Sequence, residues 1–317
     1  MTMKSDGQEA VDGALLDLLA QLRSMSYAFV TPTPKTHEIV VRSRRGEAAR
    51  TVSDVLGWSL PYAPGTVDRG LEASLKRADV LVPQGDLVRA TIRVSSLDGR
   101  LYVHSAFPTV APDSVFFGPD SYRFASLLRT RLGNDRAGQV IVDVGTGAGI
   151  GAIVASDCSP GSTLIATDIN PLALRFAKLN ARAAEKGIVT YQGDILGGYV
   201  GPIDVAAANP PYIVDSERRQ YRDGGGLHGA ELSLRMTQAI LPRLNHGGKF
   251  ILYTGSAIVA GEDRFRALAT AAARTHECTI DYWEIDPDVF GEELESPAYR
   301  GVDRIAAVGA VFTRASR

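Results

Sequence analysis

The spacing of apolar residues in the first part of the chain predicts a small α+β domain. In the stretch "AVDGALLDLLAQL" apolar residues recur at helical spacing, so an amphipathic helix is expected over residues 9–24. Farther along, apolar residues alternate on both sides of the turn signal Asp98-Gly99, which predicts a β-hairpin at residues 88–107. These signals predict an accessory domain over residues 1–110.

The region between these two elements has short and mixed signals. It contains an apolar stretch at Ile39–Val41 and a segment, "TVSDVLGWSLPYAPG", that predicts a brief helix ending at Gly57 or Trp58. Pro61 follows and cannot continue that helix. The pattern is compatible with a small α+β or winged-helix-like fold.

The pattern changes near Gly138, where apolar strands and amphipathic helices begin to alternate. This alternation is typical of an α/β protein with a doubly wound parallel sheet. The expected strands are "VIVDV" (140–144), "TLIAT" (163–167), "IVTYQGD", "IDVAAAN", "KFILYTG", "CTIDYWEI" and "RIAAVGAVF". Helices are expected between them, near residues 230–243 and 260–275 among others. A second domain is therefore predicted over residues 111–317.

One of these helices has clear start and stop signals. Asn170 is a favourable cap, Pro171 suits the first helical position, and Gly187 is expected to end the helix. The residues expected to be buried on one face of this helix are Leu172, Phe176, Leu179 and Ala183.

Composition restricts the function classes. A net charge of -2 argues against binding of nucleic acid through bulk positive charge, although a local basic patch remains compatible with it. Cys158 and Cys278 lie far apart, without a second Cys or His at metal-ligand spacing, so no metal site is expected and a reducing compartment is indicated. No apolar run approaches the roughly 18 residues of a membrane helix. We expect a cytoplasmic protein without a membrane partner.

A glycine-rich loop follows the first strand of the predicted sheet. "DVGTGAGIG" (143–151) lies between a strand and a helix, where doubly wound folds bind their ligands. A dinucleotide fingerprint would need its third glycine at position 150, which is Ile. A tight turn without a ligand is the simpler alternative for such a loop. The spacing D-x-G-x-G-x-G instead resembles the first motif of class I S-adenosylmethionine-dependent methyltransferases.

Two acidic residues follow at the ends of later strands. Asp168 lies 21 residues after Gly147, where a carboxylate can accept hydrogen bonds from both ribose hydroxyls of a nucleoside cofactor. Asp194 is expected beside the adenine amino group, with Ile195 against the ring, by resemblance to the same methyltransferases. A strand-end cap at Asp168 and an ordinary turn at Asp194 are the alternatives.

The residues Asn209-Pro210-Pro211-Tyr212 follow the fourth strand. The Asn side-chain carbonyl and a backbone carbonyl held by proline can accept the two N–H hydrogens of a planar nitrogen, and the Tyr ring can pack on its face. Such acceptors would direct the nitrogen lone pair towards a methyl donor, and no strong base is required. A rigid turn is the alternative.

Together these motifs resemble the HemK-like family, whose members methylate glutamine side chains of release factors or of a ribosomal protein. The resemblance covers about residues 115–290 and implies a sheet of order 3-2-1-4-5-7-6. It also implies that Asn209 and Pro210 bind the amide nitrogen, and that S-adenosylmethionine is converted to S-adenosylhomocysteine. The segment "FFGPDSYRF" makes Phe117 and Tyr122 candidate walls for the methionine part of the cofactor.

The candidate residues fall into two sets. The catalytic set is Asn209, Pro210, Pro211 and Tyr212. The cofactor-binding set is Phe117, Tyr122, Asp143, Gly145, Thr146, Gly147, Gly149, Asp168, Ile169, Asn170, Asp194, Ile195 and Asn209.

The chain departs from the family at two places. The family's N-terminal domain has five helices, whereas this chain has a hairpin-containing domain of different pattern. After the fifth strand, "LYTGSAIVAGE" lacks the Glu and Gln common in the family. The acceptor therefore stays open between a protein glutamine and a small amide, guanidine or amine. A nucleobase of RNA or DNA is the less favoured acceptor, and a non-catalytic module that binds the cofactor is the alternative outside enzymes.

The loop after Tyr212 carries further charged and glycine residues. Gly224, Gly225 and Gly226 are candidates for a mobile lid over the substrate. Solvated charge is expected for Arg218, Arg219 and Arg222, with recognition of an acidic substrate as the alternative. The acidic run "EELES" (292–296) is also expected to be solvated, with binding of a cationic substrate such as a guanidine or amine as the alternative.

Overall fold

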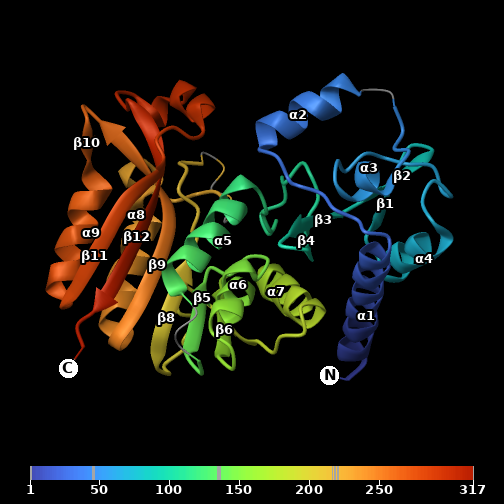
Figure 1. Ribbon diagram of the computed structural model, residues 1–317. Helices are drawn as coiled ribbons and strands as arrows, with labels where there is room; N and C mark the ends of the chain where they lie inside the picture. Colours follow the sequence, from blue (N-terminus) through green and yellow to red (C-terminus); the bar gives the residue numbers. More distant parts are fainter. Residues whose placement is uncertain are drawn as a thin grey trace.

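The computed structural model describes residues 2–44, 47–133, 137–215, 217, 219 and 221–316. The described helices and strands form an N-terminal group beside a large α/β sheet (Figure 1). Arg218 lies outside the described residues, so its predicted role is left as a prediction.

The N-terminal group mixes helices and short strands, as the sequence pattern indicates. Its elements are α1 (Thr2–Ser24), α2 (Pro34–Ser43), α3 (Val52–Leu56), α4 (Arg69–Arg77), β1 (Leu81–Gln84), β2 (Leu87–Ala90), β3 (Ile92–Leu97) and β4 (Arg100–Ser105). The expected N-terminal helix and the brief helix before Gly57 are both present. Helix α2 was not expected. Its start is explained by Thr33, whose hydroxyl accepts the N–H of Thr36, and by Pro34 in the first turn.

The predicted hairpin is present but shorter than expected. Strands β3 and β4 pair antiparallel around Asp98 and Gly99, both of which adopt positive φ, as a two-residue hairpin turn requires. The expected start at residue 88 is wrong, because β2 pairs with β1 in a separate hairpin. Gly85, with φ +63°, lies in the turn that makes this earlier pairing possible.

The α/β part contains one large sheet. Its strands are β5 (Val140–Val144), β6 (Thr163–Asp168), β7 (Val189–Gln192), β8 (Ile203–Ala208), β9 (Leu244–Val259), β10 (Glu262–Asp263), β11 (Cys278–Asp286) and β12 (Arg304–Arg314). The strand order is β7-β6-β5-β8-β9-β12-β11, with β10 paired to β9. Apart from β10, this is the predicted order 3-2-1-4-5-7-6, and the α/β class I methyltransferase fold is confirmed. The final strand β12 runs antiparallel to both neighbours.

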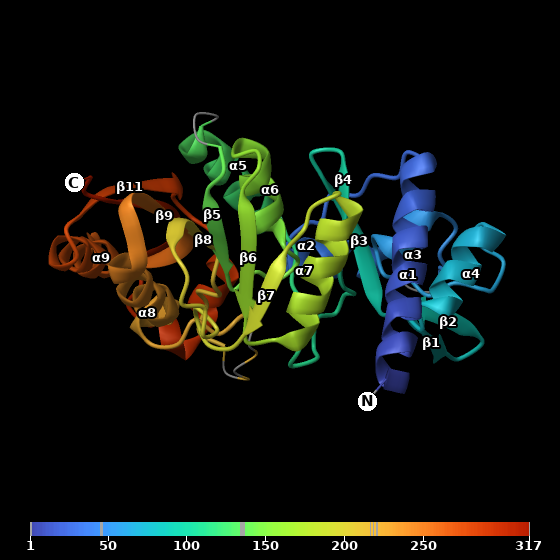
Figure 2. The ribbon, with the colours of Figure 1, turned by 90° about the horizontal axis from the view of Figure 1, so that it is seen from below.

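Helices cover both faces of this sheet (Figure 2). The helices are α5 (Pro119–Leu132), α6 (Ile150–Cys158), α7 (Pro171–Ala183), α8 (Glu231–Ile240) and α9 (Arg264–Thr275), with short 3-10 turns at Leu227–Gly229, Leu241–Arg243, Gly291–Glu295 and Pro297–Tyr299. Strand β9 illustrates the layering, because its successive side chains point to opposite faces. Phe250 and Leu252 pack with α8 and α9, whereas Ile251 and Tyr253 belong to the core with α5, α6 and α7.

Helix α7 begins as predicted and ends early. Asn170 caps it by accepting the N–H of Leu172, and Pro171 is its first residue. The helix ends at Ala183 and not at Gly187, because Glu185 already adopts a left-handed conformation with φ +59°. Of the predicted buried face, Phe176 and Leu179 are buried, whereas the predicted burial of Leu172 and Ala183 is only partial.

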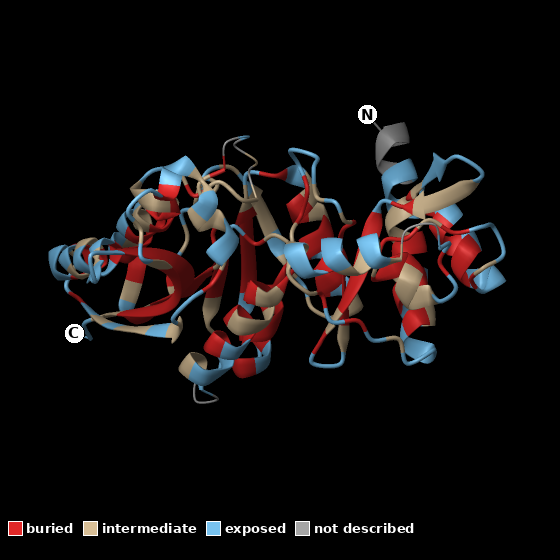
Figure 3. Cartoon of the chain, turned by 90° about the horizontal axis from the view of Figure 1, so that it is seen from above, coloured by how far each residue is buried: buried red, intermediate tan, exposed pale blue. Residues whose placement is uncertain are grey.

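The N-terminal group shares a hydrophobic core with the helices on one face of the sheet. Buried side chains such as Leu15 of α1 and Leu179 of α7 belong to one continuous apolar cluster, visible as adjoining buried segments in Figure 3. An ion pair joins the same two helices, from Arg175 to Asp12 at 2.8 Å. The N-terminal group is therefore held firmly against the face of the sheet that carries α7.

Candidate functional site

The glycine-rich loop lies at the carboxyl end of β5 and lines a cavity, which we call the glycine-loop cavity. Its backbone is tied to the next strand, because the N–H groups of Gly145 and Thr146 both bind the carbonyl of Thr167 at 2.9 and 3.0 Å. The residues of the predicted cofactor-binding set that line this cavity are Asp143, Gly145, Thr146, Gly147, Asp168, Ile169, Asn170, Asp194, Ile195 and Asn209. The fold thus brings together side chains from four strand ends.

Asp143 stabilises the conformation of the glycine-rich loop through hydrogen bonds. Its carboxylate accepts hydrogen bonds from the Thr146 hydroxyl at 2.6 Å and from the N–H of Ala152 at 2.9 Å. A methyl group at Gly151 would lie 2.2 Å from this carboxylate, so only glycine fits there. Burial is the largest influence on Asp143 and raises its pKa to about 7. This residue therefore organises the loop and the first turn of α6.

Asp168 ends β6 at the wall of the cavity. One carboxylate oxygen accepts the N–H of Gly147 at 3.0 Å and the other accepts the N–H of Asn170 at 2.9 Å. Its pKa is raised, with burial as the largest cause. A carboxylate has about four acceptor positions, so acceptor capacity remains for a ligand. Asp168 can therefore shape the loop and bind hydroxyl groups at the same time.

A second, apolar cavity begins where the first one ends. This NPPY cavity is lined by the four residues Asn209 to Tyr212, together with Phe107, Val110, Asp120, Phe290 and others. Phe116, Asn209, Pro211 and Tyr221 line both cavities. A molecule in one cavity would thus meet a molecule in the other beside Asn209.

Tyr212 is anchored by a buried carboxylate that the sequence did not point to. Its ring is 4% exposed, and its hydroxyl donates to Asp120 at 2.8 Å. Tyr253 donates to the other oxygen of Asp120 at 2.8 Å. The guanidinium of Arg123 lies 3.3 Å from that same oxygen. Burial is the largest influence on Asp120 and raises its pKa. The tyrosine of the motif is therefore fixed by α5 and β9.

Sequence comparison covers the residues that line the glycine-loop cavity and the Asn209–Tyr212 motif of the NPPY cavity. Residues 113–240 match the family model of the methyltransferase small domain. This part of the chain is therefore similar to a methyltransferase small domain.

Individual relatives that match this part of the chain have more specific names than the family model. The chain is 35% identical over 157 residues to a release factor glutamine methyltransferase of Deinococcus radiodurans, a match that covers 48% of this chain and 55% of the relative. It is 31% identical over 143 residues to the release factor glutamine methyltransferase of Rhodopirellula baltica, covering 40% of this chain and 48% of the relative. The matches span about half the length of these relatives. The resemblance to the HemK-like family is confirmed over this part of the chain.

Solved structures resemble the chain more distantly. Ribosomal protein L11 methylase from Lactobacillus delbrueckii subsp. bulgaricus has a TM-score of 0.43 and 19% identity, and the match covers 63% of this chain and 81% of that one. This likeness is too distant to bear on the activity.

Three predicted residues of the methyltransferase domain do not line the glycine-loop cavity. Phe117 is buried against His104 on the side of the N-terminal group, and the Tyr122 hydroxyl accepts the N–H of Thr31. The neighbouring Phe116 lines the cavity instead. Adjacent residues of an extended segment point in opposite directions, and the sequence did not reveal which phenylalanine faces the cavity.

Gly149 is the third of these residues. It has φ +84°, and a methyl group there would lie 3.0 Å from the backbone of Ala177. This glycine therefore permits close packing of α6 against α7, and it does not line the cavity. The structure thus gives Gly149 a packing role, and its predicted cofactor role stays a prediction.

Asp194 and Ile195 also line the glycine-loop cavity. Asp194 accepts a hydrogen bond from Arg235 of α8 at 2.5 Å. Its predicted role beside an adenine ring stays a prediction, since that carboxylate also has a protein partner.

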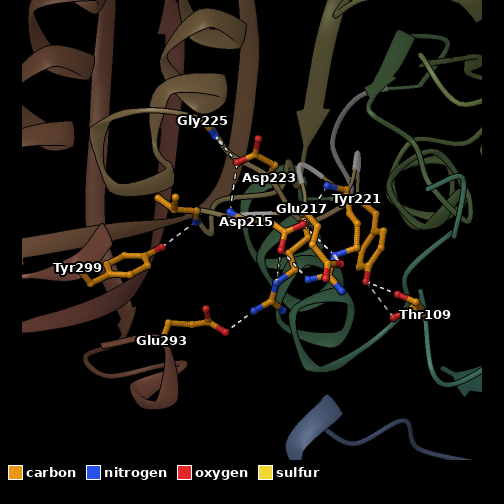
Figure 4. A network of polar contacts seen from close by, with 11 residues as sticks. Thr109, Asp215, Glu217, Tyr221, Asp223, Gly225, Glu293 and Tyr299 are labelled. Atoms are coloured by element: carbon orange, nitrogen blue, oxygen red, sulfur yellow. Dashed lines mark hydrogen bonds and ion pairs between the residues drawn. The ribbon is translucent and has the colours of Figure 1, made fainter. Parts of the chain in front are cut away.

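The loop after Tyr212 is held by a network of ion pairs and hydrogen bonds (Figure 4). Arg219 binds Asp215 through Nε at 2.8 Å, Arg222 binds Glu293, and the hydroxyl of Tyr221 donates to the carbonyl of Thr109 at 2.5 Å. The expectation of solvated charge is therefore wrong for Arg219, Arg222 and Glu293. All three side chains are at least partly buried and paired.

The glycine run of this loop is required by close packing. A methyl group at Gly224 would lie 1.9 Å from the carbonyl of Gly229, and the N–H of Gly224 binds the carbonyl of Ile213 at 2.8 Å. The N–H groups of Gly225 and Gly226 bind carboxylates of Asp223 and Glu231. These contacts explain why glycine occupies the three positions, without any movement of the loop as a lid.

Two further findings concern membrane helices and metal sites. Among the described residues, no helix is both long and apolar enough to cross a membrane. Within the same part of the chain, no group of three or more His, Cys, Asp and Glu side chains is arranged to hold a metal ion.

Proposed function

We propose that this chain is an S-adenosylmethionine-dependent N-methyltransferase that acts on an amide nitrogen, most favourably that of a protein glutamine side chain. The observation that carries the proposal is the position of Asn209, which lines both the glycine-loop cavity and the NPPY cavity. A residue at this junction can contact a methyl donor on one side and an acceptor on the other.

The glycine-loop cavity suits a nucleoside cofactor. Asp168 has acceptor capacity left for ribose hydroxyls, and backbone N–H groups, among them those of Gly147 and Asn170, keep the carboxylate in place. Gly147 lies beside Asp168, and a Cβ atom added to it would have no neighbour within 4 Å. A ligand can therefore approach the backbone closely there. Asp194 would bind the adenine amino group, with Ile195 against the ring. When bound, S-adenosylmethionine supplies an electrophilic methyl group.

The residues of the motif would orient the acceptor. The side-chain oxygen of Asn209 and the backbone carbonyl of Pro210 accept the two hydrogens of the amide nitrogen, which directs its lone pair towards the donor cavity. Pro210 and Pro211 have no N–H to compete for these acceptors. Because the nitrogen becomes cationic during transfer, its proton can leave afterwards and no strong base is needed.

A protein glutamine is favoured as acceptor by the sequence relatives, which are named release factor glutamine methyltransferases. The different N-terminal group leaves a small nitrogen compound as a possible acceptor. Both cysteines are free and buried, which is compatible with the cytoplasmic location that we propose.

The decisive experiment is a labelled-methyl transfer screen with release factors, total RNA and a small-metabolite pool. We expect label in a protein or a small molecule, with the methyl group on nitrogen in the product's mass spectrum. Label in RNA would show that the acceptor is a nucleobase and not a protein or small molecule. A methyl group on oxygen or carbon would refute the nitrogen assignment. Binding of S-adenosylmethionine without transfer to any pool would indicate a non-catalytic module.

A further inference from the structure

The NPPY cavity continues inward to a narrow recess among residues of the N-terminal group. This inner recess is lined by Thr31, Pro34, Arg93, His104, Phe107 and Phe116, among others. Pro34, Phe107, Thr109 and Phe116 line the NPPY cavity as well, so the recess is its extension. Its walls are mostly aromatic and proline rings, and Arg93 supplies its positive charge.

Arg93 is a buried cation without a carboxylate partner among the described residues. It is 4% exposed, and its Nε has no hydrogen-bond partner. Its side chain donates to the Thr31 hydroxyl at a long 3.4 Å, and its guanidinium lies 5.6 Å from the centre of the Phe29 ring. By contrast, Arg219 and Arg222 of the same cavity system are both paired with carboxylates. Burying a charge in this way is costly unless a partner binds it.

The polar groups beside Arg93 are neutral. His104 has Nδ1 at 3.1 Å from the carbonyl of Ser105, so Nδ1 carries the proton and Nε2 accepts from the Ser95 hydroxyl at 2.7 Å. The Thr31 hydroxyl bonds to Ser95 in turn, and burial holds the pKa of His104 well below its usual value. This chain of hydrogen bonds supplies no negative charge.

Arg93 itself keeps its charge at neutral pH. Burial, the largest influence, lowers its pKa to about 10, which is still well above neutrality. The nearby Tyr27 is also neutral, because burial raises its pKa and its hydroxyl donates to the carbonyl of Val94 at 2.9 Å. Among the described residues, Arg93 is therefore a positive charge of the recess without a carboxylate partner.

We propose that the inner recess binds a carboxylate group of the methyl acceptor through the guanidinium of Arg93. The inference depends on the proposed function in that the NPPY cavity must hold the acceptor. A planar carboxylate matches the donor geometry of a guanidinium. The acceptor would then carry an acidic group as well as the amide, and Arg93 would determine specificity.

Propionate and its neutral isostere propionamide are suitable probes, measured by ligand-observed NMR on the full chain. We expect propionate to bind roughly tenfold or more tightly than propionamide, because hydrogen bonds to charged groups are the stronger ones. Arg93→Met should abolish this preference. Arg44→Met removes the same charge from an arginine that already pairs with Asp54, and should retain the preference.

Thr31→Asp keeps the proposal testable if Arg93→Met fails to fold. The new carboxylate would lie beside Arg93, neutralise it and eliminate propionate binding. Equal binding of the two probes by the wild type, or a preference that persists in Arg93→Met or in Thr31→Asp, would overturn the proposal. None of these measurements needs methyl transfer. A carboxylate preference without transfer would therefore contradict only the proposed function, and transfer without the preference would contradict only the inner recess.

Discussion

The hydroxyl of Tyr212 donates a 2.8 Å hydrogen bond to Asp120, which lies 92 residues earlier in the chain. Asp120 belongs to the first turn of α5, and Tyr253 of β9 binds the other oxygen of the same carboxylate. The sequence motif suggested that only the ring of Tyr212 would matter, through packing on the acceptor. The structure gives the hydroxyl a partner of its own, so the position of the ring depends on a buried carboxylate.

Tyr212→Phe is therefore expected to destabilise the protein. The substitution leaves Asp120 with fewer donors in a buried site, and loss of one hydrogen bond to a charged group costs about 1.5–3 kcal/mol. The free energy of unfolding from denaturant titration measures this. Tyr102→Phe is the matched control, because the buried hydroxyl of Tyr102 has no partner among the residues that the structure describes, and its removal should cost almost nothing. Equal losses in the two variants would show that the Asp120 contact does not contribute.

Asp168→Ala is expected to weaken binding of S-adenosylhomocysteine by at least about tenfold, since each hydrogen bond to a charged acceptor contributes about 1.5–3 kcal/mol. Titration calorimetry gives the dissociation constant directly. Asp157→Ala is the control, because that carboxylate pairs with Arg100 and Lys186 away from the glycine-loop cavity. An unchanged dissociation constant in Asp168→Ala would mean that this residue is only a strand-end cap.

Asp143 should make stability depend on pH. Its folded-state pKa is about 7, above the ordinary value of 3.8, so the folded protein retains a proton that the unfolded chain releases. Stability from this residue is therefore present below about pH 4 and is lost as pH rises to about 7. In Asp143→Asn this contribution is absent.

The difference in unfolding free energy between wild type and Asp143→Asn isolates this effect from the other titrating groups. We expect the wild type to lose up to about 2.7 kcal/mol relative to the variant between pH 5 and pH 7, at about 1.36 kcal/mol per pKa unit. Denaturant titrations at the two pH values measure it. A difference that does not change with pH would show that the Asp143 pKa is not raised.

Asn209→Ala is expected to lower the rate of methyl transfer by roughly 10²–10³, comparable with loss of one preorganised polar contact at a reacting centre. Cofactor affinity should fall only modestly, because the proposed contact is with the acceptor. Single-turnover transfer and calorimetry separate the two quantities once an acceptor is known. Loss of binding in proportion to loss of rate would make Asn209 a cofactor or structural contact.

Much of the α/β part could be predicted from local patterns. Strand β5 coincides with the apolar run "VIVDV", and the cap at Asn170 and the turn at Asp98-Gly99 were read from residue type alone. Such features depend on neighbours in the sequence, since capping, turn conformation and side-chain periodicity are local. Helix α2 was missed because its segment combines two prolines with a short apolar stretch.

The chain alone thus determined the glycine loop, the Asn-Pro-Pro-Tyr turn and their place at the carboxyl edge of the sheet. Only the tertiary structure decided that Phe116 and not Phe117 faces the glycine-loop cavity, that Gly149 serves packing, and that Arg219 and Arg222 are paired. It also placed Asp120 within hydrogen-bond distance of Tyr212 and, in the described part of the chain, left Arg93 without a carboxylate. These relationships join residues distant in sequence, and the partner of a buried charge depends on packing that no local pattern encodes.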